Sequence, residues 1–207
     1  TPLYLIDAPA RGVGKGLLAD VLSIVVVGRL AGVMSLPRSD EEVEKRITGT
    51  LVAGHPLILL DNVTTLRSNS LNAVLTTTEW VGRILGQSQM VRVSNSATWI
   101  ATGNNVTMSD EMARRVVPIR LDAGVERPEE RTGFRHEDLA GWTADNRSRL
   151  VDSCLTIIQS WVDEGMPLGR ITLGRFEAWA RVLGGILEVV CVPGFLGNRE
   201  RIYAEAD

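Results

Sequence analysis

The chain has 207 residues, with 22 basic and 25 acidic side chains and 44% hydrophobic residues. These values are near those of ordinary globular proteins and allow a substantial buried core, which argues against a disordered or collagen-like chain. The formal net charge of -3 argues against a globally basic nucleic-acid binder, and no apolar run approaches the roughly 18 residues of a membrane span.

The two cysteines, Cys154 and Cys191, lie in apolar periodic stretches and show no zinc-ligand spacing. We expect both to be buried thiols of a protein in a reducing compartment, the cytoplasm. The chain opens with Thr1-Pro2 directly before an apolar run, without the features of a signal peptide. It is therefore expected to be a piece of a longer protein.

The first half of the chain predicts alternating strands and helices. Residues 3–6 form an apolar run, which is followed by a glycine-bearing loop over 7–15 and an apolar-rich helical stretch to residue 30. Residues 39–54 open with Ser39-Asp40 and carry apolar side chains at helical spacing. Residues 56–61 form a continuous apolar run that ends in Asp61, typical of a strand buried on both faces of a parallel sheet.

The pattern continues and then changes. Residues 68–80 predict a helix, 83–85 and 90–93 two short strands around a turn, 97–102 a buried strand, 109–115 a short helix and 116–121 a strand. After about residue 126 only helical periods remain, over 138–164 and 173–190. We predict an α/β fold with a three-layer, parallel central sheet over 1–125 and a mostly helical C-terminal appendage or lid over 126–207.

The loop before the first long helix carries the first chemical signal, Gly12-Val13-Gly14-Lys15. Between a strand and a helix, backbone amides can cradle phosphate oxygens while a lysine reaches the β and γ phosphates. This predicts a nucleoside triphosphate ligand; the alternative is an ordinary glycine-rich turn. The predicted nucleotide contacts are Ala10, Arg11, Gly12, Val13, Gly14, Lys15, Gly16, Leu17 and Asp61.

Two positions depart from the usual phosphate-loop pattern. Pro9 stands where the first glycine is expected, and Gly16 stands where a Ser or Thr hydroxyl normally ligates magnesium. Asp61 is predicted to lie beside the loop, at the end of an adjacent strand, and to hold Mg²⁺ through water. Asn62 follows it where many ATPases place a glutamate base, and an amide can orient water but cannot accept its proton.

Further candidates come from the next elements. Asn104 is our first choice, and Asn105 the second, for an amide at a strand tip that contacts the γ-phosphate or the attacking water. Arg114 and Arg115 end a short helix, from which a guanidinium can reach a neighbouring subunit and stabilise charge on the transferred phosphoryl group. The alternative for one of the two arginines is a solvated helix end.

In this order, the segments resemble an AAA+ ATPase core. The nearer likeness is to the ATPase domains of phage and plasmid primase-helicases related to superfamily 3 helicases. The resemblance covers residues 3–122, with Walker A at 8–16, Walker B at 57–62, sensor 1 at 99–105 and the arginine finger at Arg114-Arg115. It implies ATP and Mg²⁺ as cofactors, hexameric rings with ATP between subunits, and DNA replication in a phage or other mobile element.

The resemblance also implies movement on single-stranded or forked DNA through a central channel lined by a hairpin. That hairpin is expected at 82–94, with Arg83, Gln87, Gln89 and Arg92 as DNA contacts; the alternative is a sheet-edge hairpin with solvated arginines. An upstream primase domain is a possible partner. Gly16 and Asn62 leave open a nucleotide-dependent switch that does not hydrolyse ATP, and an AAA+ remodeller of proteins is a second alternative.

Overall fold

The computed structural model describes residues 1–84 and 89–199. Its central sheet has five parallel strands in the order β2-β3-β6-β1-β7. The strands are β1 (Leu3–Ala8), β2 (Val33–Met34), β3 (Leu57–Leu66), β6 (Thr98–Met108) and β7 (Val116–Arg120). All five therefore end at the same edge of the sheet, where the loop that follows β1 also lies.

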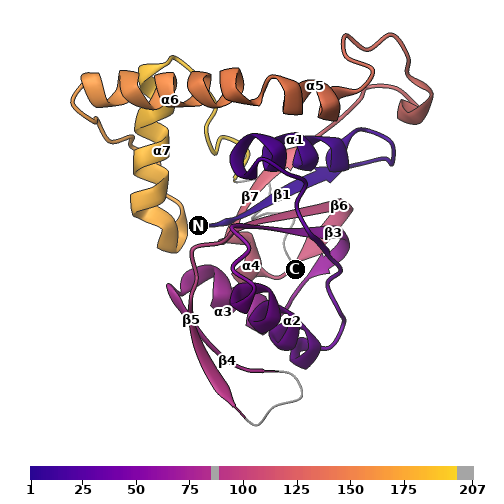
Figure 1. Cartoon of the computed structure of the whole chain (residues 1–207), viewed down its shortest axis with the longest axis vertical. Coiled ribbons are helices and arrows are strands. Elements are labelled where there is room, and N and C mark those ends of the chain that lie inside the picture. Colours follow the sequence, from indigo (N-terminus) through magenta and orange to yellow (C-terminus); the bar gives the residue numbers. More distant parts are fainter. Residues whose placement is uncertain (85–88, 200–207) are drawn as a thin grey trace.

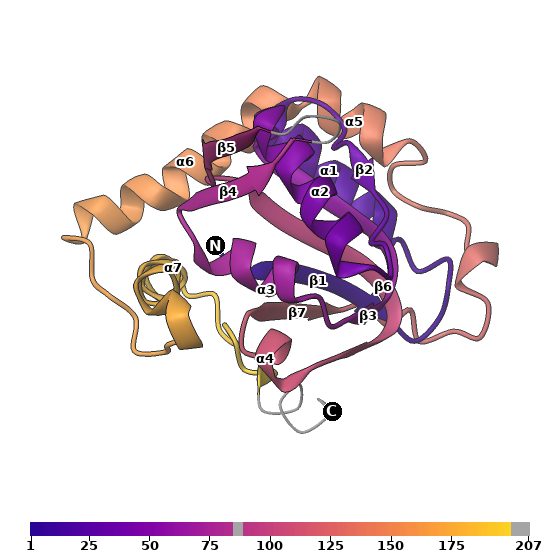
Figure 2. The same cartoon turned by 90° about the horizontal axis from the view of Figure 1, so that it is seen from below.

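Helices cover both faces of this sheet (Figures 1 and 2). On one face lies α1 (Lys15–Val27), and α5 (Leu139–Asp145) and α6 (Arg147–Asp163) run end to end across it. The other face is covered by α2 (Asp40–Val52), α3 (Asn69–Thr76) and α4 (Asp110–Ala113). The predicted fold class, a three-layer α/β protein with a parallel central sheet, is confirmed.

The strands divide their apolar side chains between the two faces because successive residues of a strand point to opposite sides. Leu3 and Leu5 of β1 belong to the larger core, under α2, α3 and α4. Ile6 belongs to the smaller core, which packs against α1 and includes Ala19. A sheet buried on both faces explains the continuous apolar runs in the sequence.

The C-terminal part is helical, as predicted, and packs on the sheet. Helix α7 (Glu177–Val189) follows a short 3-10 helix (Gly174–Phe176). The ring of Trp179 meets Tyr4 of β1 edge to face, with centroids 6.1 Å apart. Phe176 and Ala180 are buried in the larger core, so these helices share a core with the sheet.

The segment after α3 differs from the sequence prediction. A helix was expected to reach residue 80, but α3 ends at Thr76 and an antiparallel pair follows, β4 (Glu79–Arg83) and β5 (Met90–Ser94). The indole N–H of Trp80 donates a 2.9 Å hydrogen bond to Thr48 of α2. Packing against α2 therefore outweighs the local helix propensity of this segment and makes it a strand.

The prediction that both thiols are buried is wrong. Cys154 on α6 and Cys191 just after α7 are both exposed and unpaired. The apolar periodicity of α6 suggested a buried helix, yet none of its residues is buried. Within residues 1–84 and 89–199, no helix is long and apolar enough to cross a membrane.

Candidate nucleotide-binding site

The loop between β1 and α1 has a backbone that favours glycine at two positions. Gly12 has a φ of 74° and Gly14 a φ of 95°, both in the left-handed region that strains other residues. Gly14 is the N-cap of α1, which has no side-chain cap and no acidic residue in its first turn. The first amides of α1 are therefore open to an anion, as in phosphate sites at helix N-termini.

Lys15 is the first residue of α1, and its ammonium lies 3.5 Å from the carbonyl oxygen of Ala10 in the same loop. Burial lowers the pKa of Lys15, and the carboxylates of Asp7 and Asp61 act against this shift. Lys15 is thus within electrostatic reach of both acids. Of the other predicted nucleotide contacts, Arg11, Gly16 and Leu17 are exposed and Val13 is half-buried.

Asp61 lies at the same edge of the sheet as the loop between β1 and α1 (residues 9–14), which is the candidate phosphate loop. The expectation that its strand is adjacent to β1 is wrong, because β6 lies between β3 and β1. Its side chain lies on the α1 face, as does that of Leu59 two residues earlier. The hydroxyl of Thr102, on β6, donates a hydrogen bond to the Asp61 carboxylate. The intervening strand therefore orients the carboxylate.

Asn62 lies in a β-bulge, because the register of β3 against β6 shifts just after Leu60. Its φ is 54°, and its backbone N–H donates a 3.1 Å hydrogen bond to the hydroxyl of Thr102. The bulge requires a glycine opposite: a Cβ on Gly103 would lie 2.4 Å from the carbonyl oxygen of Val63. Asn62 thus lies where the regular pairing of β3 with β6 is interrupted, and its side chain is exposed.

An ion pair that the sequence reasoning missed lies beside the phosphate loop. The Arg120 guanidinium, at the end of β7, pairs with Asp7 at the end of β1. It also donates a 2.9 Å hydrogen bond to the side-chain oxygen of Asn105, whose Nδ2 donates to the carbonyl of Pro9 at 3.4 Å. Because a guanidinium only donates and a carbonyl only accepts, the orientation of this amide is determined.

One feature of the sequence could have indicated this network: Asp7 and Arg120 carry opposite charges at the ends of two predicted parallel strands. Asn105, our second choice, is the amide that contacts the phosphate loop. Asn104, our first choice, pairs with Ala8 in the register of β6 and β1 and is half-buried. Its side chain makes no hydrogen bond within the described residues. The roles of both amides remain predictions.

The donors at this edge suit a magnesium ion, which prefers oxygen ligands and keeps several waters. Asp61 supplies a carboxylate beside the Thr102 hydroxyl, and burial, followed by the charge of Asp61, raises the pKa of Asp20 on α1. A Cβ on Gly16 would meet no heavy atom within 4 Å, which leaves room for water. The described residues contain no group of three or more His, Cys, Asp or Glu side chains that could hold a metal.

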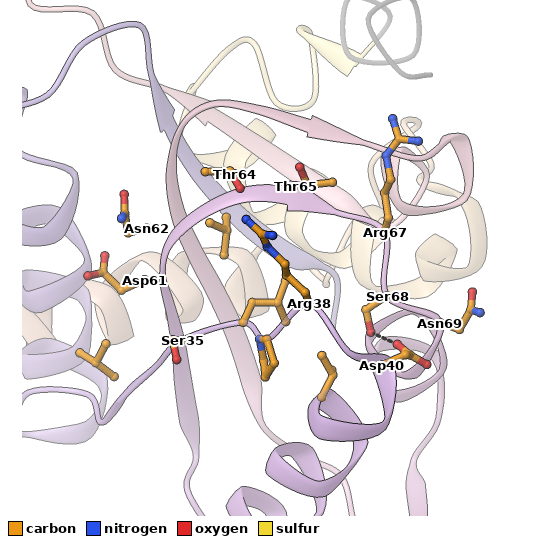
Figure 3. Close-up of a pocket in the computed structure, with 15 residues that line it drawn as sticks. Ser35, Arg38, Asp40, Asp61, Asn62, Thr64, Thr65, Arg67, Ser68 and Asn69 are labelled. Atoms are coloured by element: carbon orange, nitrogen blue, oxygen red, sulfur yellow. Dashed lines mark hydrogen bonds between the residues drawn. The ribbon is translucent and has the colours of Figure 1, made fainter.

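A cavity of about 790 Å³ lies at the end of β3, and Asp61 and Asn62 form part of its lining (Figure 3). The loop from β2 to α2 contributes Ser35 and Arg38, and the loop from β3 to α3 contributes Arg67. Figure 3 shows the Arg38 side chain extending toward the part of β3 that bears Thr64 and Thr65.

Arg38 and Arg67 were not singled out from the sequence, because two isolated arginines in separate loops carry no pattern. Both are exposed, and neither makes an ion pair in the part of the chain that the structure describes. Asp40, in the same lining, accepts hydrogen bonds from Ser68 at 2.6 Å and from the hydroxyl of Ser70 at 2.9 Å. The cavity therefore combines an engaged carboxylate with two unpaired guanidinium groups.

The two candidate finger arginines lie at the opposite edge of the sheet, where β7 begins. Arg114 is exposed. Arg115 folds back on α4: one terminal nitrogen donates to the carbonyl of Glu111, and the other lies 3.7 Å from the Glu111 carboxylate. A full strand length separates both from the phosphate loop, so neither reaches a triphosphate bound to its own chain.

The predicted DNA contacts fall on the β4–β5 pair and its turn. Arg83 and Gln89 are exposed, and Arg92 forms a 2.9 Å ion pair with Glu79 on the neighbouring strand. Gln87 lies outside the described residues. Because Arg92 and Glu79 are both mostly exposed, their pair is weak and leaves the guanidinium able to exchange partners.

The chain matches no family model and no curated protein. It is similar in structure to the C-terminal region, residues 305–718, of NrS-1 in an apo form, with a TM-score of 0.47 and 19% identity. That similarity covers 70% of this chain and 33% of the NrS-1 chain. A similarity to JCV helicase, solved with a bound small molecule, has a TM-score of 0.46 and 12% identity and covers 100% of this chain and 56% of the helicase chain.

The chain thus spans a third of one of these solved chains and just over half of the other. The fold class rests on the strand order and register of the sheet.

Proposed function

We propose that this chain is the motor domain of an ATP-dependent helicase or translocase, which binds ATP and Mg²⁺ and hydrolyses the ATP. The single observation that carries the proposal is the convergence of Lys15 and Asp61. They lie 46 residues apart in the sequence. Lys15 nevertheless begins the helix that follows β1, and Thr102, which bonds the Asp61 carboxylate, is in register with Ile6 near the end of β1, so both groups lie at the same edge of the sheet.

In this proposal the amides of residues 12–16 and the Lys15 ammonium bind the phosphates. Asp61 holds Mg²⁺ through water, and Asn62 and Asn104 orient the attacking water. A bound Mg²⁺ would neutralise charge on the β and γ phosphates. Residues 1–125 would form the ATPase core, and 126–207 its helical lid.

The decisive test removes one of the two lysines of the chain. Lys15→Ala should abolish ATP binding measured by calorimetry, because the loop loses the cation that reaches the β and γ phosphates. Lys45→Ala is the matched control, since Lys45 pairs with Glu41 and Glu42 on the surface of α2. Normal ATP binding and turnover by Lys15→Ala would refute the proposal.

We further propose that the chain acts as a hexameric ring on single-stranded or forked DNA. The position of Arg114 at the edge far from its own phosphate loop supports a role toward a neighbouring copy. The cavity beside Asp61 supports a contact with the DNA backbone near the site of hydrolysis, because Arg38 and Arg67 offer unpaired cations to its phosphates.

The DNA partner is tested by ATP turnover with and without single-stranded oligonucleotides. We expect single-stranded oligonucleotides to stimulate ATP turnover. The double variant Arg38→Ala, Arg67→Ala should bind the oligonucleotide more weakly. The slope of its logarithmic binding constant against the logarithm of salt concentration should also become shallower, by about one for each lost phosphate contact. Arg170→Ala, an exposed arginine in the loop after α6, is the control. Absence of stimulation and of binding would remove DNA as the partner.

A nucleotide-dependent switch is the second candidate, favoured by the chemistry of two residues. Gly16 offers no hydroxyl to a metal, and Asn62 offers no carboxylate to the attacking water. A switch would bind ATP with Mg²⁺ without steady phosphate release. Measured turnover in excess ATP therefore separates the switch from the motor.

A further inference from the structure

The connector between β7 and α5, residues 121–138, packs against the phosphate loop. It starts with a 2.8 Å hydrogen bond from the Leu121 amide to the carbonyl of Asp7, the residue two before Pro9. Further along, a Cβ placed on Gly12 would lie 2.8 Å from the Cβ of Glu129 and 3.0 Å from its backbone nitrogen. The connector therefore touches the loop directly.

The far end of the connector is held beside α1. Helix α5 packs along α1, and the Arg147 side chain at the start of α6 donates a 2.9 Å hydrogen bond to the carbonyl of Ile24, near the end of α1. Since α6 begins at the C-terminal end of α1, α5 begins toward its N-terminal end. Figure 1 shows the connector on the same side of the molecule as the start of α1.

This stretch carries aromatic side chains. Phe134 is 52% exposed, although it is a large apolar residue. The guanidinium carbon of Arg131 lies 5.3 Å from the centre of its ring, and His136 stacks on Trp142 with centroids 4.3 Å apart. The Phe134 ring is therefore backed by a cation on one face and remains open to another planar group.

The direction of a bound nucleotide follows from the proposed function, on which this inference rests. Lys15 and Asp61 place the terminal phosphate on the side of β1 that faces β6 and β3. The nucleoside must then leave the loop on the other side of β1, where β7 and the connector lie. Phe134 belongs to this connector, five residues beyond the contact between Glu129 and Gly12.

We propose that Phe134, backed by Arg131, is the stacking platform for the base of the bound nucleoside triphosphate. A stacked aromatic ring recognises the π face that every base has, so it adds affinity with little choice among bases. Purines offer the larger face and gain more from the stack. Removing the ring is expected to weaken nucleotide binding by about tenfold or more.

The test compares ATP with inorganic tripolyphosphate, which has the phosphates but no base, by calorimetry on the full chain. Phe134→Ala should raise the Kd for ATP by about tenfold or more and leave the Kd for tripolyphosphate within about twofold. Phe134→Leu, which keeps an apolar side chain without a ring, should behave like the alanine variant. Phe134→Trp should restore the affinity for ATP.

Four results would overturn the inference. Equal losses for both ligands in Phe134→Ala would mean that the residue supports the fold of the connector, and wild-type affinity for ATP in Phe134→Leu would mean that no ring is needed. Wild-type protein that binds ATP no more tightly than tripolyphosphate would also refute the platform while leaving the phosphate site intact. Binding of neither ligand would refute the proposed function itself, and the platform with it.

Discussion

Thr102 determines the geometry of the site at the scale of single residues. It is only 2% exposed, and its hydroxyl donates to the Asp61 carboxylate while it accepts the backbone N–H of Asn62. One buried hydroxyl therefore holds both the carboxylate and the residue beside it. Removing it leaves a donor and an acceptor without a partner, which costs more than the net value of a single hydrogen bond.

Thr102→Val tests this role, because valine has the same shape without the hydroxyl. We expect a loss of about 1–3 kcal/mol in the free energy of unfolding, measured by denaturant titration. ATP turnover should fall more than ATP affinity, since Asp61 and Asn62 are misplaced while the phosphate loop is unchanged. Thr65→Val, at an exposed position of the same region, is the control; equal effects of the two variants would contradict this account.

At the scale of elements, Asp40 joins the N-terminal ends of α2 and α3. Its carboxylate accepts hydrogen bonds from the hydroxyls of Ser68 and Ser70 and from the Ser70 amide. Burial raises the pKa of Asp40, but these hydrogen bonds outweigh burial and bring the pKa below its ordinary value of 3.8. The ionised form is therefore the one that the folded protein stabilises.

The sign of the pH dependence follows from this shift. A carboxyl group with a lowered pKa in the folded state contributes stability above its ordinary value of 3.8, and that contribution disappears as the pH falls through the folded pKa. Asp40→Asn should thus lower the free energy of unfolding by about 1 kcal/mol near pH 7. The difference in free energy of unfolding between Asp40→Asn and the wild type should become smaller as the pH falls below the ordinary pKa of Asp40, 3.8. Asp152→Asn, on the exposed face of α6, should show no such trend.

The sequence predicted the elements around the phosphate loop well because their signals are local. The strand, the glycines and Lys15 follow each other within a few residues, so periodicity and turn chemistry were sufficient. The two-residue strand β2 was missed, and β3 and β6 continue to Leu66 and Met108, beyond the predicted ends at 61 and 102. These extensions depend on pairing between β3 and β6, which no local pattern records.

At the scale of the whole molecule, the two arginines before β7 have different surroundings. Arg115 is engaged by Glu111, and its Nε is buried without a partner. Arg114 is exposed at the far edge of the sheet. Under the proposed trans role, Arg114 would reach a neighbouring copy without first breaking contacts within its own chain, whereas Arg115 would have to leave Glu111.

This difference predicts separate outcomes for the two arginine variants. Arg114→Ala should leave ATP affinity unchanged and lower kcat by about a thousandfold, the effect of removing an arginine supplied by a neighbour. Arg115→Ala should mainly lower the free energy of unfolding, measured by denaturant titration. Turnover per protomer should rise with protein concentration in the wild type. A concentration-independent rate, or equal kinetics in both variants, would contradict the trans role.

The sequence by itself determined the alternation of strands and helices, the glycine-bearing loop after β1 and the place of Asp61 after a buried apolar run, since each is written in neighbouring residues. Only the tertiary structure decided that β6 lies between β1 and β3, that Arg120 joins Asp7 to Asn105, and that both cysteines are exposed. The reason is that Arg120 and Asp7 are 113 residues apart. Their contact exists because parallel strands bring their ends to one edge of the sheet, and the order of those strands depends on long-range pairing.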